Sequence, residues 1–550
     1  MENSKIIFSM NNVSKVLSSG KYLVKDINLS FFYGAKIGII GENGSGKSTL
    51  LNIISGNDQN YIGDIISDKE FSVGILEQDP KLDINKTVFE TIKEANHKII
   101  SMLDEFDKIS QKFTDPNILD DPIKFQKLID RQGELQDEID TAGGWEIDNK
   151  IDKAMSSLRT PPGDSLIKNL SGGERKRVAL CKLILQSPDV LLLDEPTNHL
   201  DTESVNWLEK YLEYYKGTVI TITHDRYFLN NVSKWILELD KGIGVPWKGN
   251  YHSWLDQKIS QIKFDKHKIS KKLNNLINEL EWFNSSSELK LQINKNRLNN
   301  YEKLLKQNSI ISDNLELYIP PGPRLGNNVL QFKSVTKKYN KNTIIDNLSF
   351  NLPQSGITGI IGPNGCGKTT LFKLILELEF PNSGEILKGK TVKTSYFDQL
   401  YQNINKNTSV WDIISGGNEF LNLSGKKINS RSYISKFKFS GQDQGKNIRV
   451  LSGGEKNRLN LALTFLSEGN LLLLDEPTND LDINTLRILE QALINYVGCA
   501  LVISHDRMFL DRICTHILSF EGNSKARFFE GSYSEYMQNK HLRLSSDSSK

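Results

Sequence analysis

The sequence contains one glycine-rich pattern twice, and this repeat constrains the fold more than any other feature. Residues 41–48 read GENGSGKS and residues 362–369 read GPNGCGKT, so both match G-x-x-x-x-G-K-[ST]. An apolar stretch at 36–40 precedes the first copy and a helical stretch at 49–54 follows it, and the second copy has the same flanks. A strand, a glycine-rich turn and a helix in this order bind phosphate, because backbone N–H groups and the helix N-terminus converge on it.

Further motifs follow each copy at matched distances. They are LSGGE at 170–174 and 451–455, LLLDEPTNHLD at 191–201 with LLLDEPTNDLD at 472–482, and THDR at 223–226 with SHDR at 504–507. From Gly41 to Gln78 is 37 positions, as it is from Gly362 to Gln399. The interval between Gln78 and Leu170 is 40 positions longer than its counterpart in the second half. The pattern predicts two related domains, each with a doubly wound α/β sheet and a helical subdomain.

The two loops predict ATP binding. We expect Lys47 and Lys368 to neutralise the terminal phosphates, and Ser48 and Thr369 to ligate Mg²⁺. The nucleotide-binding residues expected from the loops are Gly41, Glu42, Asn43, Gly44, Ser45, Gly46, Lys47, Ser48, Thr49, Gly362, Pro363, Asn364, Gly365, Cys366, Gly367, Lys368, Thr369 and Thr370.

An acidic pair closes an apolar strand in each half, and a histidine follows 29 positions later. We expect the aspartate to hold Mg²⁺, the glutamate to polarise the attacking water as general base, and the histidine to assist. These residues are Asp194, Glu195 and His224 in the first half and Asp475, Glu476 and His505 in the second.

With LSGGE as its diagnostic signature, the chain resembles the ATP-binding cassette superfamily. The resemblance implies that two cassettes pair head to tail, so that the signature of one covers ATP held by the other. It adds Gln78 and Gln399 as metal ligands and these signature residues as nucleotide contacts: Ser171, Gly172, Gly173, Ser452, Gly453 and Gly454. Tyr339 stands where the family stacks an aromatic ring on adenine, whereas the first half has Val16 and Leu17 there.

The 40 extra residues predict an arm near 97–140, built as a helical hairpin. Apolar residues recur at helical spacing on both sides of a break at 114–121. The arm holds six Lys/Arg and eleven Asp/Glu, so its negative charge favours a protein partner over RNA. A solvated spacer without a partner is the alternative.

A second helical hairpin is expected at 258–320, between the two cassettes. It holds eleven Lys/Arg and seven Asp/Glu. Near its tip Lys295, Arg297 and Tyr301 suit contact with RNA phosphates and bases. A plain helical tether is the alternative. The expected boundaries are 1–257 for the first cassette, 258–320 for the linker, 321–540 for the second cassette and 541–550 for a short tail.

Two cassettes joined by a charged helical hairpin resemble the ABC-F class of translation factors. This resemblance implies binding in the ribosomal E site, a linker reaching the peptidyl-tRNA, an arm on the mobile stalk, and ATP-dependent gating of entry into elongation. It also implies a monomer whose cassettes pair within one chain. The alternatives are the ATPase subunit of a membrane transporter, an ABC-F factor that protects ribosomes from antibiotics, and a scaffold with inactive cassettes.

From its composition we expect the protein to be cytoplasmic. Hydrophobic residues make up 38% and charged residues 25% of the sequence, and no apolar run reaches the roughly 18 to 20 residues that span a bilayer. The four cysteines lack the spacing of a zinc site and are expected to be reduced thiols.

Overall fold

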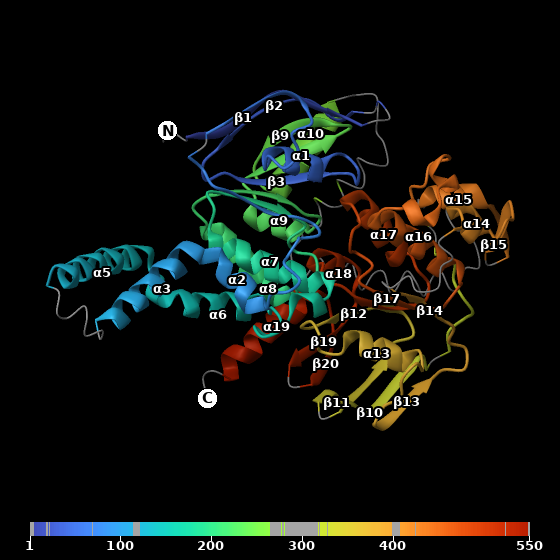
Figure 1. The fold of residues 1–550 in the computed structure, drawn as a ribbon. Helices are drawn as coiled ribbons and strands as arrows, with labels where there is room; N and C mark the ends of the chain where they lie inside the picture. The colour runs from blue at the N-terminus through green and yellow to red at the C-terminus, as the bar shows by residue number, and fades with distance from the viewer. Residues whose placement is uncertain are drawn as a thin grey trace. The chain divides into compact units, whose positions relative to one another are not determined.

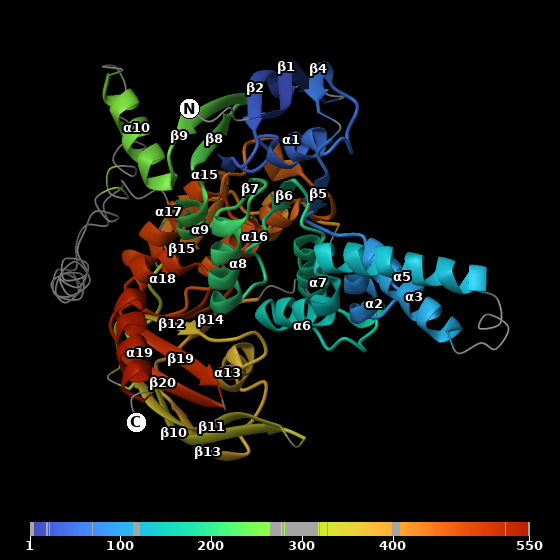
Figure 2. The same ribbon diagram turned by 90° about the vertical axis from the view of Figure 1, so that its left-hand side faces the viewer.

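The computed structural model describes residues 5–17, 20, 22–68, 70–113, 122–264, 277, 280, 317, 319–326, 328–340, 342–398, 407–423, 425–522 and 524–547. The chain forms two compact units, shown as ribbons in Figures 1 and 2. Unit 1 comprises Met1–Ile40, Gly44–Thr223 and Asn231–Asn250, and unit 2 comprises Gly41–Asn43, His224–Asn230 and Tyr251–Lys550.

The sheets of the first repeat consist of one large and one small sheet. The large sheet is six-stranded, in the order β5-β6-β7-β3-β8-β9, and the small one is three-stranded, in the order β2-β1-β4. The strands are β1 (Ile6–Val16), β2 (Tyr22–Phe32), β3 (Lys36–Gly41), β4 (Ile62–Ser67), β5 (Val73–Leu76), β6 (Val190–Asp194), β7 (Thr218–Ile222), β8 (Trp235–Asp240) and β9 (Ile243–Lys248). Strands β5, β6, β7 and β3 pair in parallel, and the continuous apolar runs of β6 and β7 are buried throughout.

The first repeat contains eight α-helices among the described residues. They are α1 (Lys47–Ile54), α2 (Val88–Lys93), α3 (His97–Lys112), α5 (Pro122–Ala142), α6 (Ile147–Ser157), α7 (Gly172–Gln186), α8 (Thr202–Tyr214) and α9 (Arg226–Val232). The single-turn 3-10 helices are Glu94–Asn96, Gly144–Glu146 and Ile167–Asn169.

The predicted arm is present as helices α3 and α5, which lie side by side in Figures 1 and 2. Leu135 and Ile139 are fully buried between the elements, whereas Ile129 is 41% exposed. Arg131 donates to both carboxylate oxygens of Glu105 at 2.9 and 3.1 Å. Apolar packing together with this bidentate pair therefore holds the two helices in register.

Unit 2 repeats the architecture. Its large sheet has the order β14-β17-β18-β12-β19-β20 and its small sheet the order β11-β10-β13. Its strands are β10 (Leu330–Tyr339), β11 (Asn342–Leu352), β12 (Gly356–Ile361), β13 (Ser383–Lys388), β14 (Thr394–Phe397), β15 (Phe420–Leu423), β16 (Lys426–Asn429), β17 (Leu471–Asp475), β18 (Cys499–Ile503), β19 (His516–Gly522) and β20 (Lys525–Glu530). Its helices are α10 (Tyr251–Phe264), α13 (Lys368–Ile375), α14 (Val410–Ser415), α15 (Ser430–Lys436), α16 (Gly453–Leu466), α17 (Ile483–Ile494), α18 (Arg507–Ile513) and α19 (Tyr533–Asp547), with 3-10 turns at Asp443–Gly445 and Ile448–Val450.

Both repeats thus have the predicted α/β fold with a parallel sheet and helices packed around it. Helix α10 runs through the expected boundary at 257/258, and α19 continues to Asp547 through the expected tail. Most of the expected linker, including Lys295, Arg297 and Tyr301, lies outside the described residues. Within the part of the chain that is described, no helix is long and apolar enough to cross a membrane.

Candidate nucleotide-binding sites

The second glycine-rich loop lies between β12 and α13, where the sequence predicts it. Gly367 precedes α13 with φ of 106°, and a Cβ there would come 2.5 Å from the Ile344 side chain, so glycine is required. The Lys368 Nζ donates to the carbonyl oxygen of Gly362 at 2.7 Å and lies 3.3 Å from His505 Nε2. Lys368 therefore contacts both the backbone of its own loop and the predicted histidine, His505.

The acidic pair at the end of β17 faces this loop. The Thr369 hydroxyl donates to Asp475 Oδ2 at 3.0 Å, and His505 Nε2 lies 3.3 Å from Glu476 Oε1. The His505 backbone N–H donates to the other oxygen of Glu476 at 3.3 Å. The structure thus brings together Lys368, Thr369, Asp475, Glu476 and His505 from both ends of the unit's sequence.

Burial sets the protonation of both carboxyls. Desolvation raises the pKa of Asp475 to about 6, against the opposing effects of the Thr369 hydroxyl and the Lys368 charge. Desolvation likewise raises the pKa of Glu476 to about 7, although Lys368 favours the charged form. A carboxyl whose pKa lies near neutrality can take up a proton from water, which is the property of a general base.

In the first repeat, the contact between the loop hydroxyl and the aspartate of the acidic pair recurs. The Ser48 hydroxyl hydrogen-bonds the Asp194 carboxylate, whose pKa burial raises. Lys47 and Glu195 are both buried, and His224 follows β7 by two residues. Gly46 has φ of 95°, and a Cβ there would lie 2.8 Å from the Leu23 carbonyl oxygen. Gln78 is exposed just beyond β5.

The two acidic pairs share a backbone feature that sequence cannot show. Glu195 and Glu476 have φ of 49° and 51°, in the left-handed region that residues with a Cβ rarely adopt. Such strain persists only where surrounding contacts fix it, and it is found at functional sites. Here Glu195 N–H donates to Ile222 O at 2.8 Å and Glu476 N–H to Ile503 O at 2.9 Å. Each glutamate is thereby tied to the neighbouring strand that leads to the histidine.

A pair of buried hydroxyls, absent from the residues expected from the sequence, also joins the acidic loop to that strand. Thr197 Oγ1 and Thr223 Oγ1 are 2.9 Å apart, and Thr478 Oγ1 and Ser504 Oγ are 2.8 Å apart. In each repeat the first hydroxyl comes two positions after the glutamate and the second directly before the histidine. The matched spacing was the signal that could have identified them as positioning residues.

The signature residues form helix N-termini. Ser171 caps α7, its Oγ accepting from the Glu174 N–H while Glu174 accepts from the Ser171 N–H, and Ser452 caps α16 in the same way. Gly172 and Gly453 are the first residues of these helices. Backbone N–H groups at the start of a helix can bind an anion such as a phosphate, so both signature segments are suited to this role.

The residues expected beside adenine differ between the repeats. Tyr339 is 40% exposed at the end of β10, where Lys337 lies 5.2 Å from the ring centroid and the phenol donates to Glu379. Val16 and Leu17 are exposed at the corresponding end of β1. Gln399, the expected metal ligand of the second repeat, lies outside the described residues.

The donors present fit Mg²⁺ and phosphate. Thr369 and Asp475 offer the oxygen atoms that Mg²⁺ prefers. The Ser45 hydroxyl in the first loop is buried without a hydrogen-bond partner among the described residues, as expected for a group that meets a ligand.

Comparison with known proteins agrees with this geometry. A family model described as "ABC transporter" matches residues 24–198 and 345–479. The chain is 46% identical over 545 residues to the "Energy-dependent translational throttle protein EttA" of Escherichia coli K12, covering 99% of this chain and 97% of that protein. It is 46% identical to the protein of the same name from Mycobacterium tuberculosis H37Rv, covering 100% and 98%.

A more distant relative and a solved structure complete the picture. The chain is 36% identical to the "Uncharacterized ABC transporter ATP-binding protein YfmR" of Bacillus subtilis, covering 94% of this chain and 82% of that protein. The structure titled "RNase-L Inhibitor" has a TM-score of 0.60 at 19% identity, covering 97% and 93%, and so shares the fold. The chain belongs to the ABC ATPase family and, within it, to the ABC-F class. It is accordingly an ATPase with two cassettes.

Proposed function

We propose that this chain is a cytoplasmic, ribosome-associated ATPase that gates the entry of translation into elongation. The observation that carries the proposal is full-length similarity to proteins named energy-dependent translational throttles. Both repeats of the sequence also keep the expected lysine, acidic pair and histidine. The chain includes the arm of unit 1, which a transporter ATPase has no evident use for.

In each proposed site the glycine-rich loop holds the phosphates of ATP against its lysine. Glu195 and Glu476 accept a proton from the attacking water, and His224 and His505 position that water and the terminal phosphate. Mg²⁺, held by Ser48, Gln78 and Asp194 in one site and by Thr369, Gln399 and Asp475 in the other, would neutralise charge that develops on the phosphates.

The proposed sites are completed in a head-to-tail pair within one monomer. Ser171 and Gly173 cover the ATP held by Lys368, and Ser452 and Gly454 cover the ATP held by Lys47. Tyr339 stacks on adenine in the second site. The backbone N–H groups at the start of α7 and α16 bind the γ-phosphate, which ATP has and ADP lacks. ATP binding therefore closes the pair of cassettes, and hydrolysis opens it.

The proposed partners are the ribosomal E site, its mobile stalk and the peptidyl-tRNA. The acidic arm, with Arg131 and Glu105 fixing its two helices, meets the stalk partly through protein. Lys295, Arg297 and Tyr301 of the linker contact RNA.

Ribosome co-sedimentation of Glu195→Gln with Glu476→Gln tests the proposal. Without a general base this variant closes on ATP but does not reopen, so it should pellet with ribosomes in ATP and not in ADP. Pelleting should weaken as salt rises, because phosphate contacts release counterions. Lys47→Met with Lys368→Met is the matched control and should stay in the supernatant. Equal pelleting of both variants, or none of either, contradicts the proposal.

A further inference from the structure

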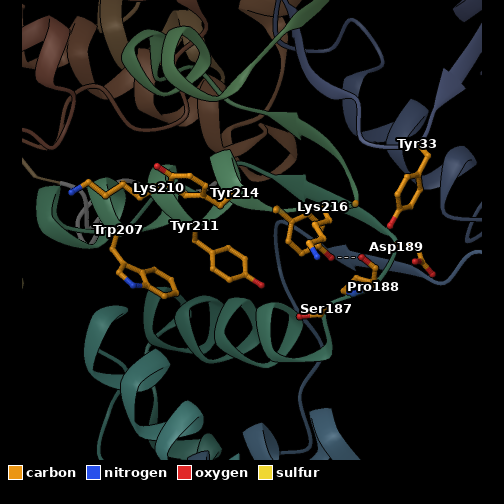
Figure 3. A pocket seen from close by; sticks show the side chains of 11 residues that line it. Tyr33, Ser187, Pro188, Asp189, Trp207, Lys210, Tyr211, Tyr214 and Lys216 are labelled. Atoms are coloured by element: carbon orange, nitrogen blue, oxygen red, sulfur yellow. Dashed lines mark hydrogen bonds between the residues drawn. The ribbon is translucent and has the colours of Figure 1, made fainter. Parts of the chain in front are cut away.

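A pocket of about 580 Å³ on unit 1 is lined by eleven residues, of which five are aromatic (Figure 3). Trp207 and Tyr211 of α8 stack with ring centroids 5.5 Å apart, and Tyr214 and Tyr215 follow them at the end of the helix. Tyr214 is 81% exposed. Aromatic rings gathered in an open hollow mark an interaction surface more often than a misplaced core.

The pocket lies at the opposite end of the parallel strands from the phosphate loop. Residues 187–189 directly precede β6, residues 216–217 directly precede β7, and Tyr33 comes shortly before β3. These are the amino ends of parallel strands, whereas the phosphate loop follows the carboxyl end of β3. The pocket is therefore a second site, separate from ATP binding.

The repeat supplies an equivalent position in unit 2. The offset that carries Glu195 onto Glu476 also carries Tyr215 onto Tyr496 and Pro188 onto Gly469. The Tyr215 hydroxyl donates to the Pro188 carbonyl oxygen, and the Tyr496 hydroxyl donates to that of Gly469 at 2.6 Å. One hydrogen bond thus fixes both surfaces in the same way.

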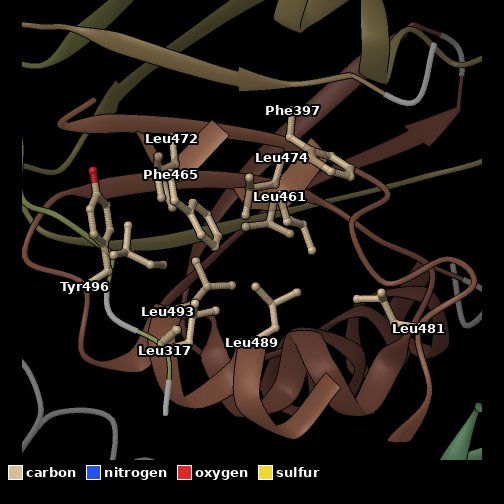
Figure 4. Packing of buried hydrophobic residues seen from close by; sticks show 14 of the residues in the cluster. Leu317, Phe397, Leu461, Phe465, Leu472, Leu474, Leu481, Leu489, Leu493 and Tyr496 are labelled. Carbon is tan, nitrogen blue, oxygen red and sulfur yellow. The ribbon is translucent and has the colours of Figure 1, made fainter. Parts of the chain in front are cut away.

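In unit 2 this surface is covered by the chain itself. A Cβ on Gly322 would come 2.5 Å from the Glu468 carbonyl oxygen, and Asn470 Nδ2 donates to the Pro323 carbonyl oxygen at 2.7 Å. Leu317 is buried in the same hydrophobic cluster as Leu493 (Figure 4). The covering residues are 317 and 319–323, which form neither helix nor strand, and the sequence from 317 to 323 reads LYIPPGP.

Unit 1 differs in the residues that would meet such a segment. Trp207, Tyr211 and Tyr214 replace what are Ile488, Ala492 and Asn495 in unit 2. Aromatic rings that line a groove bind proline-rich segments well, because proline rings pack on them and the extended segment is already ordered.

We propose that the pocket of unit 1 binds an extended, proline-containing segment of a partner protein, seated as residues 317 and 319–323 are seated in unit 2. Lys210 and Lys216 are exposed at the pocket, and the Asp189 carboxylate accepts from both the Ser72 N–H and hydroxyl. The segment therefore carries an acidic residue beside its prolines. This docking goes beyond the proposed function and requires neither ATP nor a ribosome.

Fluorescence anisotropy with a labelled peptide, LELYIPPGPR, tests the proposal. The peptide copies residues 315–324 and includes an acidic residue next to the prolines. The full-length protein should bind it, and Tyr214→Ser should bind it about tenfold more weakly, as the loss of one aromatic contact predicts. Tyr22→Ser, an exposed tyrosine elsewhere in unit 1, should leave binding unchanged. A peptide with alanine in place of each proline should bind as weakly as the Tyr214→Ser protein binds the original.

ATPase rates equal to the original protein confirm that both variants fold. Equal peptide binding by the original protein and Tyr214→Ser overturns the proposal. So does a single-stranded RNA oligonucleotide that binds in a Tyr214-dependent way while the peptide does not, because the rings would then stack bases. Ribosome pelleting of the Glu195→Gln, Glu476→Gln protein is a separate readout and does not depend on either result.

Discussion

At the scale of single residues, Cys366 distinguishes the second phosphate loop from the first, which has Ser45 at that position. Cys181, Cys499 and Cys514 are buried, and burial raises the pKa of Cys181 and of Cys499 to about 12. Because thiolate is the reactive form, N-ethylmaleimide should modify Cys366 before the other three cysteines. The added group fills the loop, so ATPase activity should fall as modification proceeds, and bound ATP should slow it. Peptide mass spectrometry identifies the modified residue.

Cys366→Ser gives this experiment its control, since it copies the first loop. The variant should hydrolyse ATP at the normal rate and lose its sensitivity to the reagent. Two results would contradict the conclusion that Cys366 is the reactive cysteine of the second loop. One is equally rapid modification of a buried cysteine, and the other is inactivation of the Cys366→Ser protein by N-ethylmaleimide.

Lys36 at the start of β3 gives a pH-dependent prediction. Burial lowers the pKa of its ammonium to about 8, and the charge of Lys234 adds to the effect. Nζ donates to the carbonyl oxygens of Tyr215 and Gly217 at 2.6 and 2.8 Å. Between pH 8 and 10.5 the unfolded chain holds a proton that the folded chain has lost, so the contribution of Lys36 to stability rises with pH.

The free energy of unfolding should therefore rise across this window relative to Lys36→Met, which cannot titrate. Urea unfolding of both proteins at several pH values measures the difference. A constant difference, or one that shrinks as pH rises, would show that Lys36 is solvated as an ordinary lysine.

At the scale of elements, sequence predicts what is local and misses what packing imposes. The loops before α1 and α13, the strands β6 and β17 and the two arm helices follow from short patterns, because glycine, apolar runs and helical spacing each act within a few residues. The positive φ of Glu195 and Glu476 depends on hydrogen bonds to a neighbouring strand, which no local pattern encodes.

The same reasoning explains why the aromatic pocket was not predicted. Trp207 and Tyr211 read as one face of an amphipathic helix, and only the fold places them beside the amino ends of β6 and β7. Helix α10 likewise spans the expected boundary at 257/258, because its helical pattern continues on both sides of that position. Leu317 is buried with the second cassette, although it lies within the expected linker.

The arm offers a prediction at this scale. Leu135 is fully buried where α5 meets its neighbours, so Leu135→Ala should cost about 2 to 5 kcal/mol of local stability. Hydrogen exchange should accelerate in α3 and α5, and ribosome association should weaken if the arm contacts the stalk. ATPase activity without ribosomes should stay normal because the catalytic residues lie elsewhere.

Ile129→Ala is the matched control for the arm, since Ile129 is 41% exposed on the same helix. It should change hydrogen exchange little. Loss of ATPase activity in Leu135→Ala would instead show that the arm supports the cassette itself.

At the scale of the whole molecule, the proposed mechanism depends on which LSGGE signature contacts the ATP bound by which phosphate loop. The two repeats share their sheet order, their strained glutamates and their capped signature helices. Each repeat of the sequence has its own phosphate loop and acidic pair, so the proposed head-to-tail pairing adds the signature helix of the other repeat to each ATP. Cys366 reports on the second loop alone and can reveal its partner.

Under the proposed pairing, Ser171 covers the ATP held by Lys368, and Ser452 covers the ATP held by Lys47. Ser171→Ala should therefore weaken the protection that ATP gives Cys366 against N-ethylmaleimide, since a hydroxyl and the helix start that it caps no longer hold the γ-phosphate well. Ser452→Ala should leave this protection near normal while lowering total ATP hydrolysis, and ADP should protect equally in both variants. The rate of Cys366 modification at several ATP concentrations measures the effect. The opposite pattern, in which only Ser452→Ala exposes Cys366, would mean that each signature serves the loop of its own repeat.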